Sequence, residues 1–226
     1  MKLLRLLRRS FILSIFILFA AHSASASVEL DLNYYAVPSS ARVYQCPDGK
    51  LASAGYSLCG TEAELAWYFY RNKIDSFQAG VNASFGNQIF KIVNLSLTDF
   101  RLTFSAELTA SLGPAVRFTL APGHSLMLNP ALQFNAGFLW DNIKNLYGMI
   151  DLSAQLNIGY KWWFLNTEYV RVGLNLQTGY GIPMTGVFKG LEIKSNGIIF
   201  QDSTKLLKGH DFKIYLGIAL DIGRAV

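Results

Sequence analysis

The amino-acid sequence predicts an all-β fold, a transmembrane antiparallel β-barrel, and three observations lead to it. Several segments alternate strictly between apolar and small or polar residues, as strands do when successive side chains point to opposite faces. The chain opens with an export signal. It is 51% hydrophobic and only 15% charged, yet no second long apolar run follows the signal, which argues against helical membrane spans.

The N-terminal segment predicts a cleaved secretory signal peptide at residues 1–26, followed by a single barrel domain at residues 27–226. An apolar run, residues 11–21, precedes the small-residue cleavage pattern Ala24-Ser25-Ala26. The run is shorter than the about 20 residues of a membrane-spanning helix, and an uncleaved anchor is the alternative. Four of the chain's five net positive charges belong to this segment, so nucleic-acid binding is not expected. The basic residues are Lys2, Arg5, Arg8 and Arg9.

The first predicted strand, residues 28–38, alternates Val28, Leu30 and Leu32 with acidic and amide residues. A turn-rich loop, residues 39–60, follows and contains the only two cysteines, Cys46 and Cys59. In an exported protein such a pair predicts a disulfide that closes a small loop. A metal site is the alternative, but no histidine lies near and we expect no metal.

Residues 64–71 fit either a strand or a helix, because Thr61 and Glu64 also match a helix capping box. Residues 76–85 alternate cleanly, Gly86-Asn87 reads as a hairpin turn, and residues 89–97 form a weaker strand. The clearest strand covers residues 100–112 and is broken by Gly113-Pro114. The remaining predicted strands are 116–120, 131–140, 150–162, 169–181 and 212–222, with a long loop at 182–208 before the last.

These segments make ten strands, and an even number returns both termini to the periplasmic side. Eight strands is the alternative, in which residues 61–72 become a helix and residues 89–112 become one long bulged strand.

The polar face decides between a membrane barrel and a soluble one. Its positions are mostly Gly, Ser, Thr, Asn and Gln, which suits a narrow enclosed lumen better than a solvated exterior rich in Lys and Glu. Aromatic residues gather at strand ends, as they do at membrane interfaces. A soluble lipocalin-like barrel that binds a small ligand is the alternative. The expected interface aromatics are Trp140, Tyr160, Trp162, Trp163 and Tyr169.

With this alternation, notably in residues 212–222, the whole chain resembles the small outer-membrane β-barrels of Gram-negative bacteria, which include the OmpA, OmpX and OmpW types. The resemblance implies a bacterial outer-membrane location, with outer-membrane lipids and the barrel-assembly machinery as partners. One departure is that the chain continues through Gly223-Arg224-Ala225-Val226, whereas this class often ends on a terminal aromatic residue.

The charges on the polar face form a balanced set of five acids and five bases. Unpaired buried charges are costly, so most should pair across the lumen. They either fill a narrow barrel as a structural ionic network or form a charged constriction that selects small solutes. The predicted lumen charges are Glu29, Asp31, Arg101, Glu107, Arg117, Asp151, Lys161, Arg171, Lys213 and Asp221.

The sequence therefore predicts a structural envelope component or a narrow passive channel, without a cofactor. The alternative is an adhesin that binds an extracellular ligand through the loops 39–60 and 182–208. No catalytic residues are predicted, because neither His124 nor His210 has the spacing of the outer-membrane proteases or lipid A deacylases. His210 is the residue we would watch for catalysis.

Overall fold

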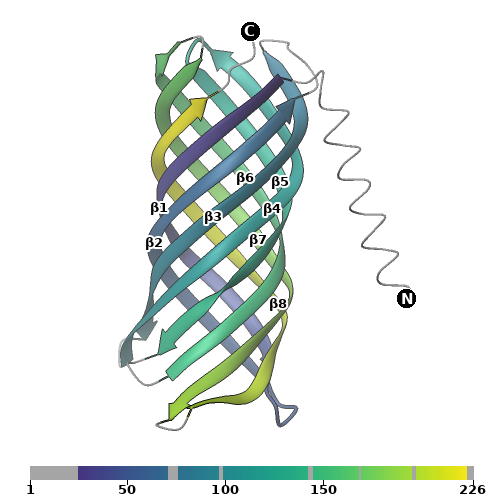
Figure 1. Cartoon of the computed structure of the whole chain (residues 1–226), viewed down its shortest axis with the longest axis vertical. Helices are drawn as coiled ribbons and strands as arrows, with labels where there is room; N and C mark the ends of the chain where they lie inside the picture. Colours follow the sequence, from purple (N-terminus) through teal and green to yellow (C-terminus); the bar gives the residue numbers. More distant parts are fainter. Residues whose placement is uncertain are drawn as a thin grey trace, which may run out of the picture.

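The computed structural model describes residues 25–70, 76–96, 99–141, 145–167, 169–194 and 197–222. These residues form eight antiparallel strands that pair in chain order, and β1 pairs with β8 to close a barrel (Figure 1). The all-β, closed antiparallel architecture is confirmed. The strands are β1 (Ser25–Gln45), β2 (Leu51–Tyr70), β3 (Phe77–Ser96), β4 (Asp99–Ala121), β5 (His124–Asp141), β6 (Asn145–Asn166), β7 (Val170–Lys194) and β8 (Gly197–Ile222).

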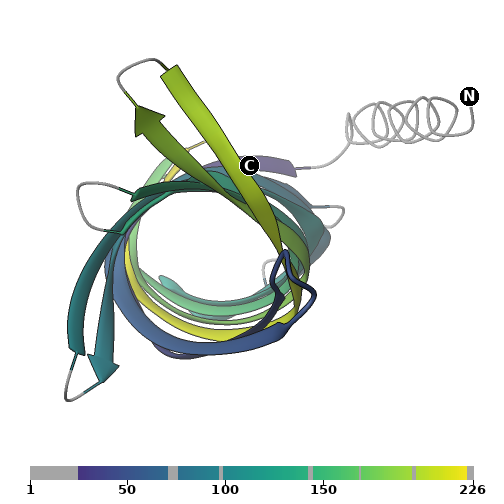
Figure 2. The same cartoon turned by 90° about the horizontal axis from the view of Figure 1, so that it is seen from below.

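The two ends of the barrel differ. The start of β1 and the end of β8 lie together at the upper end of Figure 1, which we call the terminal end. The opposite, distal end carries the tips of the β1–β2, β3–β4, β5–β6 and β7–β8 hairpins. Seen from below, the distal ends of β3 and β4 and those of β7 and β8 splay outward from the ring (Figure 2).

The sequence pattern favours ten strands, but the described residues form eight. Residues 76–85 and 89–97 belong to one strand, β3, and the expected turn at Gly86-Asn87 lies inside it. Gly86 points into the barrel, where a Cβ would come within 2.8 Å of the Thr109 hydroxyl. The glycine therefore makes room for an interior side chain instead of turning the chain. The helix considered at residues 61–72 is also wrong, because β2 runs through to Tyr70.

Pro114, which was expected to break a strand, and Pro130 lie opposite one another at an interruption of the ladder between β4 and β5. Pro114 lies within β4 and is paired with Val81 on β3. Pro130 lies within β5 and is paired with Leu156 on β6. The ladder between β4 and β5 skips from Leu112 to Val116. Proline lacks the N–H group that a ladder hydrogen bond needs. Because both prolines fall in the same short gap between β4 and β5, the ladder is interrupted only once and both strands continue past it.

The two predicted long loops are also mostly strand. Residues 39–60 form the distal halves of β1 and β2 around a short turn at residues 46–50. Residues 182–208 form the distal halves of β7 and β8. Both hairpins thus extend the barrel wall.

The predicted disulfide is wrong, because Cys46 and Cys59 are both free thiols. Cys59 pairs with Ala36, whereas Cys46 lies ten residues further along β1 in the distal turn. At about 3.3 Å per strand residue the two are roughly 30 Å apart. A disulfide requires Cα atoms within about 7 Å, so this register forbids the bond.

The apolar face is on the outside of the barrel. On β8, Phe212, Ile214, Leu216 and Ile218 are 37–60% exposed, while the residues between them point inward and are mostly buried. A soluble lipocalin-like barrel would place these side chains inside, so that alternative does not fit. An apolar exterior around a polar interior is the arrangement of a barrel in lipid.

The strands are longer than a bilayer requires. β7 and β8 have 25 and 26 residues, whereas a tilted strand needs about 9–11 residues to cross a membrane. The alternating apolar residues of β8 begin at Phe212, so much of the strand's distal half extends past them. In the part of the chain that is described, no helix is long and apolar enough to span a membrane. Of the predicted signal peptide, residues 1–24 lie outside the described residues, and its cleavage stays a prediction.

Candidate functional site

The interior near the terminal end contains a balanced ionic group that we call the terminal cluster: Glu29, Asp31, Arg117, Lys161, Arg171 and Asp221. Arg117 and Lys161 both donate hydrogen bonds to the Glu29 carboxylate. Lys161 Nζ also lies 2.8 and 3.0 Å from the two Asp31 oxygens. Arg171 pairs with Asp221. Three acids and three bases thus neutralise one another.

The contacts of Glu29 cross the lumen. Glu29 is on β1, whose sheet neighbours are β2 and β8, whereas Arg117 is on β4 and Lys161 on β6. The three side chains are 0%, 3% and 1% exposed. An eight-stranded barrel is only wide enough for its own side chains. Charged groups that meet in the middle and exclude water therefore close the lumen at this height.

Aromatic rings complete this closure. The Trp163 indole donates to the Ser125 hydroxyl at 3.1 Å, and the Arg171 guanidinium lies 4.6 Å from its ring centroid. On the other side, Tyr68 and Tyr70 stack with ring planes 5° apart. Arg117 lies 5.5 and 5.0 Å from those two rings. Cation–π attraction of this kind helps to hold desolvated guanidinium groups in place.

A second ionic group, the distal cluster, lies further toward the hairpin tips. Arg42 on β1 pairs with Asp211 on β8 at 2.7 Å and reaches Asp151 on β6 at 4.0 Å. The Asn135 amide donates to Asp151 at 2.6 Å, and Gln133 donates to Asn135 at the same distance. Ser40 donates to Asp211. This group again links strands that are not neighbours in the sheet.

Three further carboxylates inside the barrel, those of Glu62, Glu64 and Glu107, lie near the Lys213 ammonium. Glu62 accepts a hydrogen bond from Gln88 at 2.6 Å. Among the ion pairs of the described residues, none involves Glu62, Glu64, Glu107 or Lys213. Glu64 and Glu107 are partly exposed inside the barrel. Three carboxylates around one ammonium group would attract a cation, but no metal-binding group of His, Cys, Asp and Glu occurs in the described part of the chain.

The structure places nine of the ten predicted lumen charges inside the barrel, while the side chain of Arg101 lies outside the described residues. It also adds interior charges that the sequence interpretation missed. Arg42 and Asp211 fell in or beside segments assigned to loops. Glu62 and Glu64 alternate with Ala63 and Leu65, and this pattern could have revealed them.

The predicted interface aromatics divide in two. Tyr160, Trp162 and Tyr169 are 36%, 45% and 64% exposed on the outer face. The prediction that Trp163 lies at the membrane interface is wrong, because its side chain points into the lumen and is 4% exposed. A strand that alternates sides cannot present two consecutive tryptophans to lipid. The side chain of Trp140 lies outside the described residues.

Both histidines of the barrel contact aromatic residues. His124 Nδ1 lies 2.5 Å from the Tyr160 hydroxyl, and the His124 ring stacks on Trp162 with planes 2° apart. His210 stacks on Tyr180. The contacts described for these rings do not make a nucleophile–base pair, and the absence of catalysis stays a prediction.

No protein-family model matches the chain, and no curated protein matches it. Solved structures similar to it include the outer membrane protein OprG from Pseudomonas aeruginosa, with 11% identity, 89% of this chain and 98% of that chain covered, and a TM-score of 0.47. The outer membrane protease OmpT from Escherichia coli has 8% identity, coverages of 86% and 95%, and a TM-score of 0.46. Neisserial surface protein A has 11% identity, coverages of 88% and 97%, and a TM-score of 0.42.

At these identities we assign no family and carry over no activity from the three proteins. The structural class rests on the chain's own geometry. A closed antiparallel barrel with an apolar exterior and an ionic interior is a β-barrel of the outer-membrane type.

Proposed function

We propose that the protein is an integral barrel of the bacterial outer membrane whose lumen is closed near the terminal end, so that it is a structural envelope component and not an open channel. The observation that carries this proposal is the contact of Glu29 with Arg117 and Lys161 across the lumen, with all three side chains buried. Breaking such a buried pair is strongly unfavourable, which favours a lasting closure over a transient one.

Three features support the outer-membrane location. The N-terminal residues have the pattern of an export signal. The exposed face of the wall is apolar. Finally, an even number of described strands brings the start of β1 and the end of β8 to one end, which is the periplasmic end in single-chain bacterial barrels. The distal hairpins then face the outside of the cell.

Ion flux from vesicles tests the closure. Vesicles that contain the refolded protein should hold a potassium gradient as well as protein-free vesicles do. The double variant Glu29→Ser/Lys161→Ser removes both the charges and the bulk that meet in the lumen, and it should leak. Glu62→Ser, outside the terminal cluster, is the matched control and should not leak. Rapid leakage through the wild-type barrel that the double variant leaves unchanged would overturn the proposal.

The extended hairpins favour a second function, binding of an extracellular ligand. Beyond Asp211, β7 and β8 stay paired with each other as far as Lys194 and Gly197, and a segment held in a sheet loses less conformational entropy on binding than a loop. Replacing residues 191–202 by a two-residue turn should abolish attachment of protein-coated beads to cells or matrix. Attachment that survives this replacement argues against an adhesin.

A further inference from the structure

The outer wall has a hollow of about 350 Å³ over the distal parts of β8, β1 and β2, which we call the boundary hollow. Two rows of paired residues cross the three strands here, namely His210, Ala41 and Gly55, and then Lys208, Val43 and Ser53. The residues on β1 and β2 are small, so the hollow forms over them. The side chains of β8 that stand beside this space are polar.

The β8 side of the boundary hollow is basic. Lys208 is exposed, and no ion pair of the described residues involves it. The His210 ring stacks on Tyr180, which holds the imidazole in place. Asp211 faces the interior, where Arg42 pairs with it. An ammonium group and an imidazole therefore offer N–H donors to an anion, and no carboxylate occurs among the described residues that line the hollow.

The hollow lies where the apolar face of β8 ends. Phe212 is the last exposed apolar residue of the alternating segment, and His210 and Lys208 take the next positions on the same face. Beside them β7 presents Ile182 and Met184, which are 48% and 54% exposed. Basic side chains next to lipid-facing ones are typical of the level of the lipid headgroups.

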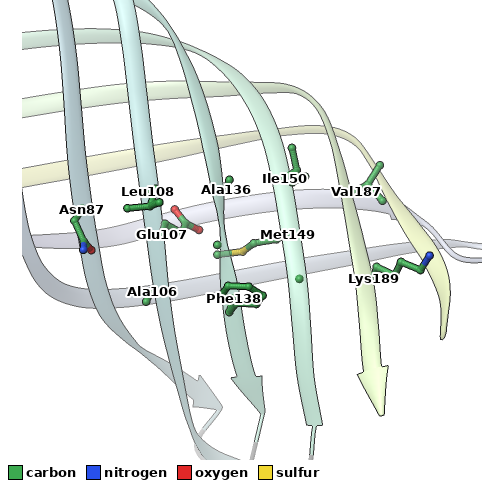
Figure 3. Close-up of a pocket in the computed structure, with 12 residues that line it drawn as sticks. Asn87, Ala106, Glu107, Leu108, Ala136, Phe138, Met149, Ile150, Val187 and Lys189 are labelled. Atoms are coloured by element: carbon green, nitrogen blue, oxygen red, sulfur yellow. The ribbon is translucent and has the colours of Figure 1, made fainter. Parts of the chain in front are cut away.

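A larger hollow of about 570 Å³ over β4, β5 and β6 provides a comparison (Figure 3). Its rim consists of exposed apolar side chains such as Leu108, Phe138 and Ile150, and the Lys189 ammonium points away from it. Lipid tails are as apolar as this rim, so burial there selects no ligand. Of the two hollows, the boundary hollow is the one whose side chains distinguish one ligand from another.

We infer that the boundary hollow binds the phosphate group of an anionic lipid in the distal leaflet. The phosphate accepts hydrogen bonds from Lys208 and His210, and such charge-assisted bonds are strong. An acyl chain of the same lipid lies along Ile182 and Met184, which a free phosphate ion would leave uncovered. The inference depends on the lipid-facing wall and is independent of whether the lumen is closed.

Lipid retention tests this site. The refolded protein is placed in nanodiscs of phosphatidylcholine with one tenth phosphatidic acid, and bound lipids are counted by native mass spectrometry. The wild type should retain phosphatidic acid over phosphatidylcholine by about fivefold, the effect of one Lys near an anionic membrane surface. Lys208→Gln should abolish this preference, and Lys208→Arg should keep it. Lys205→Gln is the matched control, because Lys205 is exposed on the same strand but does not line the hollow, and it should also keep the preference.

Gly55→Leu tests the space itself. A Cβ at Gly55 would meet only the Ser40 carbonyl oxygen, at an ordinary 3.5 Å, so a side chain fits there and fills the hollow. This variant keeps both donors and should lose the preference. Gly148→Leu is its control, because a Cβ there would meet only the Lys189 carbonyl oxygen, at 3.9 Å, and Gly148 lies outside the boundary hollow. It should behave like the wild type, and a heat-shifted gel band confirms that each variant is folded.

Four results would overturn the inference. The preference could survive Lys208→Gln or Gly55→Leu, or Lys205→Gln could reduce it as much as Lys208→Gln does, which would indicate diffuse attraction by surface charge. Alternatively, excess inorganic phosphate could displace the phosphatidic acid, which would make the free ion the ligand. Because the Lys208 variants leave the floor of the hollow unchanged, they test the site even if Gly55→Leu does not fold.

Discussion

Glu29→Gln removes the one carboxylate that two cations share across the lumen. Glu29 is 0% exposed, and its oxygens accept from Arg117 and Lys161. Lys161 would keep Asp31 at 2.8 Å, whereas Arg117 would keep the faces of Tyr68 and Tyr70 and the longer-range attraction of Asp221, which Arg171 already pairs. Removing one partner of a buried ion pair costs about 3–5 kcal/mol, so the free energy of unfolding should fall by that amount. We expect most of the loss to come from the stranded guanidinium group.

The assay is urea unfolding of the refolded protein in thin phosphatidylcholine vesicles, followed by tryptophan fluorescence. Glu107→Gln is the matched control, because it is the same chemical change in the same lumen at a carboxylate with no ion pair among the described residues. The control should change the free energy of unfolding by less than about 1 kcal/mol. In a double-mutant cycle with Lys161→Met, the coupling should reach about 1–3 kcal/mol. Equal losses for Glu29→Gln and Glu107→Gln would refute the reasoning.

Two further predictions concern packing and the cysteines. Gly173→Ala places a Cβ 2.4 Å from the Trp162 carbonyl oxygen and 2.9 Å from the Trp163 ring, and should destabilise the barrel by about 1–3 kcal/mol through overpacking in the same urea assay. Gly159→Ala, whose Cβ would meet only ordinary contacts at 3.6 Å or more, should be tolerated, and equal losses would contradict this packing. Cys46 and Cys59 should both react with a thiol reagent in unfolded, unreduced protein, and a protein without reactive thiols would contradict the register of β1 and β2.

The alternation of side chains made the architecture predictable, but it did not predict where the strands begin and end. Residues 212–222 and 100–112 alternate large apolar residues with small or polar ones, and this period identifies a strand without tertiary information. Gly86 and Pro114 were predicted to lie in turns because glycine and proline usually mark the ends of strands and helices. Inside this barrel Gly86 makes room for Thr109, and Pro114 shares a gap in the ladder with Pro130. Both reasons depend on the neighbouring strand.

The interior charges were predictable as a set but not as pairs. Glu29, Arg117 and Lys161 were each assigned to the polar face from local alternation. Their contact depends on barrel closure, which brings β1 opposite β4 and β6, and no local pattern encodes that. Arg42 was missed because the distal half of β1 lacks a clear period, and the hairpin only becomes visible through its pairing with β2 and β8.

Single-channel recording in a planar bilayer tests the closed lumen most directly. The refolded protein, residues 27–226, should insert and remain electrically silent at high salt, because the terminal cluster leaves no water path past Glu29, Arg117 and Lys161. Steady openings of constant size in the wild-type protein would contradict the closed lumen, and a change in their size on Arg117→Glu would make the terminal cluster the constriction of a channel.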